Sequence, residues 1–352
     1  HDDAIAILLA ISSPKEIECL GITVCAGNVP IELTAKNALR VLSLIENKIV
    51  PVFRGCPKPL VTNLVTAEHV HGESGLDTGS GVSLPEPIIN CEKQHAVEFI
   101  LETLSKHPSD KITLVATGPL TNLAAAYTLD PKTFKKAKNI ILMGGAGFEP
   151  GNITPAAEFN IFVDPFAAKS IFESEIEIFM FGLDVTHQMI ITPKRLSLIK
   201  KSSNSIGPTT ADLLTFFNSY DTKKYGWDGA PLHDPCTIAW LIKPEIFQMK
   251  KMSVEIETNN GPAFGRFFCG RACRAIRECV RSKRQGRRNP YGPCDHRRQK
   301  VNALPFNIIS EIAQSREGAL GGPVQHLGTD CSWKLPDIPQ DCFCIGPMTD
   351  CI

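Results

Sequence analysis

The chain has 352 residues and is 43% hydrophobic, which is enough for a globular protein of one large α/β domain or two ordinary ones with a substantial core. Its 37 basic and 37 acidic residues cancel, so the overall charge gives no reason to expect nucleic acid or an anionic membrane as a partner. No apolar run approaches the length of a bilayer span and no signal peptide is visible, so we expect a cytoplasmic protein.

Helix and strand patterns alternate from the first residues onward. Asp2 and Asp3 precede an apolar run, as acidic residues often do in the first turn of a helix, and this helix should end near Pro14. The next predicted elements are the strands 17–24, 49–53, 111–116, 139–143 and 176–181 and the helices 33–45, 96–104, 121–127, 164–172 and 230–241. Near-continuous apolar strands between helices indicate a doubly wound, mostly parallel sheet with helices on both faces, over residues 1 to about 265.

Polar residues follow the predicted strands, where the ligand site of such a sheet lies. They are Asn28, Thr117, Asn152, Glu158, Asn160, Asp184, His233 and Asp234. Each alone is more simply explained as a turn residue or a helix cap, and so are Asp2 and Asp3. Together they favour a carboxylate-rich metal site beside a polar, sugar-like pocket.

Common catalytic motifs are absent from the sequence. There is no GxGxxG after the first strand, no GxxxxGK[ST], no GxSxG, no HExxH and no EF-hand loop. These absences disfavour dinucleotide, P-loop, α/β-hydrolase, zinc-protease and EF-hand chemistry.

The residues after Arg266 differ in composition from the rest of the chain. Between positions 266 and 300 there are twelve Arg or Lys against only Glu278 and Asp295. Eight of the 13 cysteines lie at or after Cys269, but their spacing does not form two CxxC pairs, so zinc binding is only weakly indicated. The other five are scattered among apolar neighbours, as reduced cytosolic cysteines are.

Over residues 1–266 the chain resembles the inosine–uridine-preferring nucleoside hydrolases. Its opening His1-Asp2-Asp3-Ala4 is similar to the end of the family motif DxDPGxDDA. Further motifs recur in the family's order, namely Ala26-Gly27-Asn28, His71-Gly72-Glu73-Ser74-Gly75-Leu76, Ala116-Thr117-Gly118-Pro119-Leu120-Thr121-Asn122-Leu123, Met143-Gly144-Gly145, Gly151-Asn152, Ala157-Glu158-Phe159-Asn160, Asp164-Pro165 and Pro231-Leu232-His233-Asp234-Pro235.

This resemblance implies hydrolysis of the N-glycosidic bond of ribonucleosides such as uridine and inosine to ribose and free base, in nucleoside salvage, with bound Ca²⁺. It implies Asp3, Asp234 and the Thr117 carbonyl as calcium ligands. Asp2, Asn28 and Asn160 would hold the ribose 2′- and 3′-hydroxyls, and Asn152 and Glu158 the 5′-hydroxyl. His233 would donate a proton to the base, with His71, Tyr225 and Trp227 on the leaving-group side. The context around Tyr225 and Trp227 favours uridine.

Two departures from the family pattern shape our expectations. The family's first strand and first aspartate would lie before His1, so the sheet should lack a central strand and the site one carboxylate. Agreement also stops after Arg266, and we expect 267–352 to be a non-family tail that is disordered or arises from a shifted frame, a retained intron or a faulty gene model. A zinc-binding or RNA-binding appendage is the alternative.

Other functions stay open at this stage. A non-catalytic nucleoside-binding protein or an inactive fragment would keep the ribose-binding residues without turnover. A periplasmic-type sugar-binding domain shares the α/β alternation but does not account for the His233-Asp234-Pro235 helix start. We expect a homo-oligomer whose partner is a small ribonucleoside, with no nucleic-acid or membrane partner.

Overall fold

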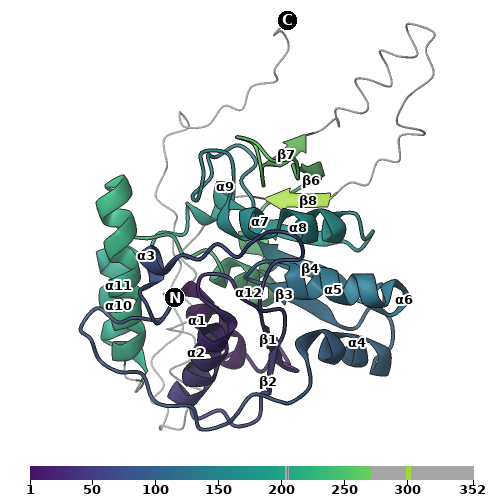
Figure 1. Cartoon of the computed structure of the whole chain (residues 1–352). Helices are drawn as coiled ribbons and strands as arrows, with labels where there is room; N and C mark the ends of the chain where they lie inside the picture. The colour runs from purple at the N-terminus through teal and green to yellow at the C-terminus, as the bar shows by residue number, and fades with distance from the viewer. Residues whose placement is uncertain (203, 205, 271–298, 303–352) are drawn as a thin grey trace, which may run out of the picture. The chain divides into compact units, whose positions relative to one another are not determined.

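Eight strands form two sheets in the part of the chain that the computed structural model describes, which is residues 1–202, 204, 206–270 and 299–302. In the smaller sheet, β1 (Ile22–Val24) pairs in parallel with β2 (Val52–Arg54). The larger sheet has the order β3-β4-β5-β8-β6-β7 (Figure 1). Its strands are β3 (Thr113–Ala116), β4 (Asn139–Met143), β5 (Ile178–Phe181), β8 (Gln299–Asn302), β6 (Met249–Ile256) and β7 (Phe267–Gly270).

The first four strands in this order run parallel, whereas β6 is antiparallel to both β8 and β7. The predicted mostly parallel α/β fold is therefore confirmed. The helices are α1 (Asp2–Ile11), α2 (Ile31–Leu44), α3 (Glu68–His71), α4 (Ala96–Lys106), α5 (Thr121–Leu129), α6 (Pro131–Phe134), α7 (Phe159–Val163), α8 (Pro165–Phe172), α9 (Leu183–Thr186), α10 (Pro193–Lys200), α11 (Gly207–Tyr225) and α12 (Pro235–Ile242), with one 3₁₀ turn at Pro244–Ile246.

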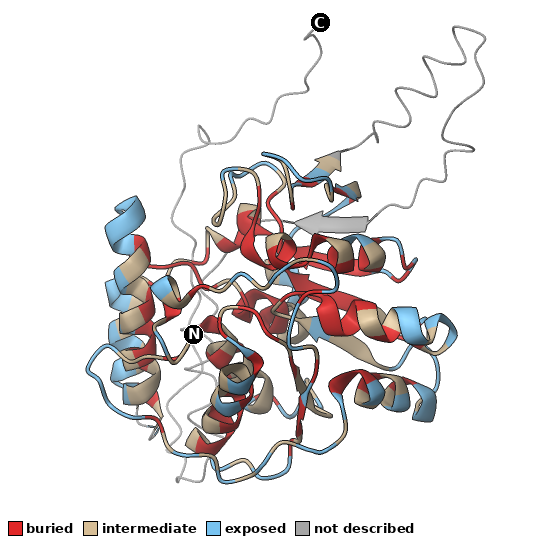
Figure 2. Cartoon of the chain, in the orientation of Figure 1, coloured by how far each residue is buried: buried red, intermediate tan, exposed pale blue. Residues whose placement is uncertain are grey.

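Helices cover both faces of the larger sheet. On β4, Ile140 and Leu142 pack into the core that includes α4, α5 and α8, whereas Ile141 packs on the opposite face with Cys236 of α12. Alternate residues of one strand point to opposite faces, so a strand covered on both sides is apolar throughout. Figure 2 shows these inner surfaces as buried. Among the described residues, no helix is long and apolar enough to cross a membrane.

Strands β1 and β3 face one another across a cavity of about 1050 Å³ instead of pairing. Ile22, Thr23 and Val24 line it from one side, and Thr113, Leu114 and Val115 line it from the other. Among the described residues, the strands are therefore divided into two sheets at this place.

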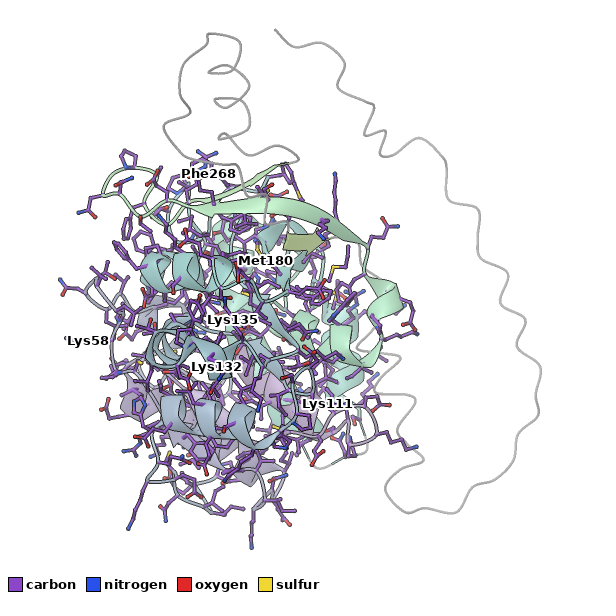
Figure 3. All side chains as sticks on the ribbon, turned by 90° about the vertical axis from the view of Figure 1, so that its right-hand side faces the viewer. Lys58, Lys111, Lys132, Lys135, Met180 and Phe268 are labelled. Atoms are coloured by element: carbon purple, nitrogen blue, oxygen red, sulfur yellow. The ribbon has the colours of Figure 1, made fainter. Side chains whose placement is uncertain are left out.

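The predicted boundary after Arg266 does not mark the end of the sheet. Residues 267–270 form β7, and residues 299–302 form β8 between β5 and β6. Phe267 is buried against Phe172, with ring centroids 5.7 Å apart, whereas Phe268 is exposed at the outer edge in Figure 3, where Met180 lies in the interior. This alternation is typical of a half-buried strand, but four residues are too few to reveal it in the sequence. The rest of the expected tail lies outside the described residues.

Helix α11 is an element that the sequence analysis did not predict. It packs against α10 on one side of the molecule (Figure 1). Its core residues Ala211, Leu214 and Phe217 alternate with many polar residues, so its apolar stripe is narrow. The helix ends at Gly226, whose φ of 68° lies in the left-handed region that favours glycine.

Candidate active site

Three aspartates converge where α1 meets α12. Asp2 and Asp3 belong to the first turn of α1, and Asp234 immediately precedes α12. One carboxylate oxygen from each lies within 4.8 Å of the others. Asp2 does not cap its own helix, because its Oδ2 accepts hydrogen bonds from the backbone N–H groups of His233 (3.1 Å) and Asp234 (3.3 Å) at the start of α12.

The protein environment disfavours the charged forms of this cluster. Burial raises the pKa of Asp234 well above its ordinary value, and the neighbouring carboxylates of Asp2 and Asp3 raise it further. Burial also raises the pKa of Asp3, while the α-amino group of His1 lowers it. Because three carboxylates this close are costly without a compensating charge, the cluster fits a hard divalent cation that prefers oxygen ligands.

Thr117 and Asn160 connect the acidic cluster to the ends of β3 and β4. The Thr117 hydroxyl donates to Asp3 Oδ1 at 3.0 Å. Asn160 Nδ2 donates to the carbonyls of Thr117 (2.9 Å) and Met143 (3.1 Å). Since both amide hydrogens are engaged, Asn160 Oδ1 is left as an acceptor in the cavity, and the Thr117 carbonyl keeps a second lone pair.

Glu158 is fixed by the main chain at the start of α7. Its carboxylate accepts hydrogen bonds from the N–H groups of Gly145 (2.8 Å), Asn160 (2.9 Å) and Ile161 (3.2 Å). Burial raises the pKa of Glu158, and these three hydrogen bonds lower it. Asn152 Oδ1 accepts from the Phe159 N–H at 2.9 Å, so the predicted 5′-hydroxyl pair is held rigidly.

An aromatic wall lies beside the cluster. Tyr225 stacks on Trp227 with ring centroids 4.7 Å apart, and His187 meets Trp227 edge-on at 5.0 Å. His71 stacks on Phe217 of α11 at 5.9 Å. Burial lowers the pKa of His71 well below its ordinary value, so its imidazole is neutral at neutral pH.

All twelve predicted site residues line the cavity described above. They are Asp2, Asp3, Asn28, His71, Thr117, Asn152, Glu158, Asn160, Tyr225, Trp227, His233 and Asp234. The structure thus brings the set together, and the role of each residue stays a prediction.

Comparison with known proteins identifies the family. The family model described as "Inosine-uridine preferring nucleoside hydrolase" matches residues 1–312. The chain belongs to this family. It is therefore a hydrolase that acts on the N-glycosyl bonds of ribonucleosides.

Relatives of this nucleoside hydrolase come from several kingdoms. An uncharacterized protein of Schizosaccharomyces pombe, C1683.06c, is 47% identical over 265 residues, which cover 75% of this chain and 84% of the relative. The pyrimidine-specific ribonucleoside hydrolase RihA of Klebsiella pneumoniae (strain 342) is 48% identical over 259 residues, 73% of this chain and 81% of the relative. The solved structure of the plant nucleoside hydrolase PpNRh1 superposes with a TM-score of 0.76 at 30% identity, covering 89% of this chain and 93% of that one.

Three residues of the hydrolase site were missed by the sequence analysis. His187 lines the cavity and contacts His233 edge-on at 6.0 Å, and burial lowers its pKa to about 4. Thr186 binds the His233 ring. Asp221 of α11 is 9% exposed and lines the cavity, and its carboxylate makes no hydrogen bond or ion pair within the described ranges. The first two follow β5, where the only sequence signal was Asp184.

Asp184 itself has a different position from the one its sequence context suggested. It does not line the cavity. Its carboxylate accepts hydrogen bonds from the N–H groups of Gly147 (2.7 Å), Phe148 (2.7 Å) and Glu149 (3.0 Å). Asp184 therefore shapes the loop after β4 from outside the pocket.

Proposed function

We propose that this chain hydrolyses ribonucleosides, uridine and inosine among them, to ribose and free base with Ca²⁺ at the three-aspartate cluster. The observation that carries the proposal is the convergence of the Asp2, Asp3 and Asp234 carboxylates within 4.8 Å in a cavity shared with His233. A cation there would lower the pKa of a bound water and hold ribose oxygens.

The ribose would bind through groups that the fold already orients. Asp2, Asn28 and Asn160 offer acceptors for the 2′- and 3′-hydroxyls, and Asn152 with Glu158 meets the 5′-hydroxyl. Cleavage passes through an oxocarbenium-like state, so carboxylates beside the ring stabilise the developing positive charge.

The leaving base would lie against the aromatic wall of Tyr225 and Trp227, with His71 nearby. His233 would give it a proton as the C1′–N bond breaks. Burial lowers the pKa of His233, and the Asp2 carboxylate opposes this by favouring the imidazolium form, which is the form that would donate the proton. The resemblance of the chain to a relative named pyrimidine-specific supports a preference for uridine.

A non-catalytic nucleoside-binding protein or an inactive fragment is the second candidate. It would use the same ribose-contacting residues, all of which line the cavity, without turnover. We also propose a cytoplasmic homo-oligomer without nucleic-acid or membrane partners.

Ribose release separates the two candidates. The full chain is incubated with uridine or inosine, with Ca²⁺ or with EDTA, and reducing sugar is measured beside calorimetric titration of each nucleoside. Calcium-dependent release supports the hydrolase, and saturable binding without release supports the binding protein. Asp234→Asn should abolish release, whereas Asp110→Asn, an exposed residue at the opposite end of β3, should not.

A further inference from the structure

The hydroxyl of Thr186 is placed against the ring of His233. Thr186 ends α9, the short helix after β5, and His233 lies just before α12. Thr186 Oγ1 lies 2.7 Å from His233 Nδ1, which is hydrogen-bonding distance. Thr186 is fully buried, and this is the one hydrogen bond that its hydroxyl makes within the described ranges.

This contact leaves the other ring nitrogen for the cavity. An imidazole has two nitrogens, and engaging one of them fixes both the rotation of the ring and the role of the other. The backbone of His233 is held independently, because its N–H donates to Asp2 Oδ2 at 3.1 Å. With the backbone and Nδ1 both fixed, Nε2, which has no hydrogen-bond partner in the described part of the chain, is the ring atom that can meet a ligand in the cavity that His233 lines.

A hydroxyl suits this position because it can act in both directions. It donates to Nδ1 when that nitrogen is unprotonated and accepts from Nδ1–H when it is protonated. A carboxylate in its place would only accept, and a methyl group would leave a buried nitrogen without a partner.

We propose that Thr186 is a positioning residue that holds His233 with Nε2 directed at the leaving base. This inference rests on the proposed function. In that reaction the C1′–N bond breaks with its electron pair on the base, which takes the Nε2 proton of the imidazolium form of His233 and leaves a neutral ring with Nδ1–H directed at Thr186 Oγ1. Water forms the new bond to C1′ and gives its proton to a site carboxylate, from which solvent carries it back to the ring.

The test compares two leaving groups. Uracil needs protonation, whereas 4-nitrophenolate leaves a ribofuranoside without it. Thr186→Val keeps the side-chain shape and removes the hydroxyl. We expect kcat for uridine to fall about 10- to 100-fold with KM within about twofold, and hydrolysis of 4-nitrophenyl riboside to stay within about twofold. Thr186→Ser should restore uridine turnover.

Thr121→Val is the matched control. The Thr121 hydroxyl is also buried and donates to Asp164 Oδ2 at 2.8 Å, but neither residue lines the cavity. Thr121→Val should lower the melting temperature of the protein without changing the ratio of the rates for uridine and for 4-nitrophenyl riboside. An equal fall for both substrates in Thr186→Val, or no fall for uridine, would overturn the inference.

A second measurement does not need turnover. In the full chain with ¹⁵N-labelled histidine, the His233 signals are identified by their loss in His233→Gln. The ¹⁵N chemical shift of His233 Nδ1 should change in Thr186→Val and should keep its unmutated value in Thr186→Ser. If neither substrate is hydrolysed by the unmutated chain, the proposed function fails. The chemical shift of His233 Nδ1 still shows whether Thr186 is hydrogen-bonded to the ring. An unchanged Nδ1 signal in Thr186→Val would overturn the positioning role.

Discussion

Asp2 Oδ2 accepts a hydrogen bond from the backbone N–H of His233 at 3.1 Å, linking the first helix of the chain to the start of α12. The same oxygen also accepts from the N–H of Asp234. One carboxylate therefore both caps α12 and belongs to the acidic cluster. Structural and chemical roles can be separated by substitution at this position.

Asp2→Ala should destabilise the protein, because two N–H groups at the start of α12 lose their acceptor. We expect the free energy of unfolding to fall by about 1–3 kcal/mol in urea denaturation. Asp2→Asn keeps an acceptor oxygen and loses the charge, so it should retain most of the stability while ribose release falls at least about 100-fold. The prediction fails if Asp2→Asn releases ribose at the unmutated rate. Asp110→Asn serves as the control for both measurements.

Calcium should raise the melting temperature and reverse its pH dependence. Folding raises the pKa of Asp3 and Asp234 above the ordinary value of 3.8, so without metal the folded state holds protons more tightly. Stability should therefore fall as pH rises above about 4 in EDTA. With calcium, which binds the deprotonated carboxylates, stability should rise with pH instead. Calcium at a hundred times its dissociation constant should add about 2.7 kcal/mol relative to the metal-free protein.

Thermal unfolding at pH 5 and pH 8, with EDTA and with calcium, checks this prediction. At each pH, the Asp234→Asn variant should melt at nearly the same temperature with calcium as with EDTA. The Asp110→Asn variant should respond to calcium as the unmutated protein does. A melting temperature that calcium leaves unchanged in the unmutated protein would argue against a cation at the cluster.

The strands and their carboxyl-end residues were predictable because both depend on local patterns. The apolar run 139–143 coincides with β4, and Thr117 and Asn160 lie where the parallel-sheet rule expects ligands. Strand ends were less predictable. The run 17–24 yields only the three residues of β1, because residues 17–21, which are exposed or half-buried, form no part of the strand.

Helix α11, which carries part of the pocket wall, could not be predicted in the same way, although Tyr225 at its end was expected from the family resemblance. Helix α11 contributes Phe217, Asp221 and Tyr225 to the cavity, but its apolar positions are diluted by polar ones. The Thr186 contact spans 47 residues of sequence and joins two residues that each have ordinary local explanations. Such a contact follows from packing rather than from spacing.

Glu158→Gln should cost stability and ribose recognition together. Glutamine has one acceptor oxygen, whereas Glu158 uses both of its oxygens to accept three N–H groups. We expect the free energy of unfolding to fall by about 1–3 kcal/mol. If Glu158 also binds the 5′-hydroxyl, kcat/KM should fall for uridine and change little for 5′-deoxyuridine.

Glu257→Gln is the control for this substitution, because Glu257 accepts the Asn259 N–H at 2.9 Å outside the cavity. In Glu257→Gln, the ratio of kcat/KM for uridine to kcat/KM for 5′-deoxyuridine should equal the ratio in the unmutated protein. If Glu158→Gln lowers kcat/KM equally for uridine and for 5′-deoxyuridine, Glu158 caps α7 and does not bind the 5′-hydroxyl.

Asp221→Asn should stabilise the protein at neutral pH. Burial, helped by the Asp2 carboxylate and opposed by Lys224, raises the pKa of Asp221 from 3.8 to about 6. The folded state therefore holds this proton more tightly than the unfolded chain does, and stability falls as pH rises from about 4 to about 6. Asparagine does not titrate, so the variant should gain no more than about 3 kcal/mol above pH 6 and nothing below pH 4.

Urea denaturation of Asp221→Asn at pH 4 and pH 7.5 measures this difference. The gain over the unmutated protein should appear only at the higher pH, because Asp221 is protonated and neutral at the lower one. Asp110→Asn is the control, because the Asp110 side chain is exposed. A variant that is less stable than the unmutated protein at pH 7.5 would show that the Asp221 carboxylate is stabilised by its surroundings, contrary to the raised pKa.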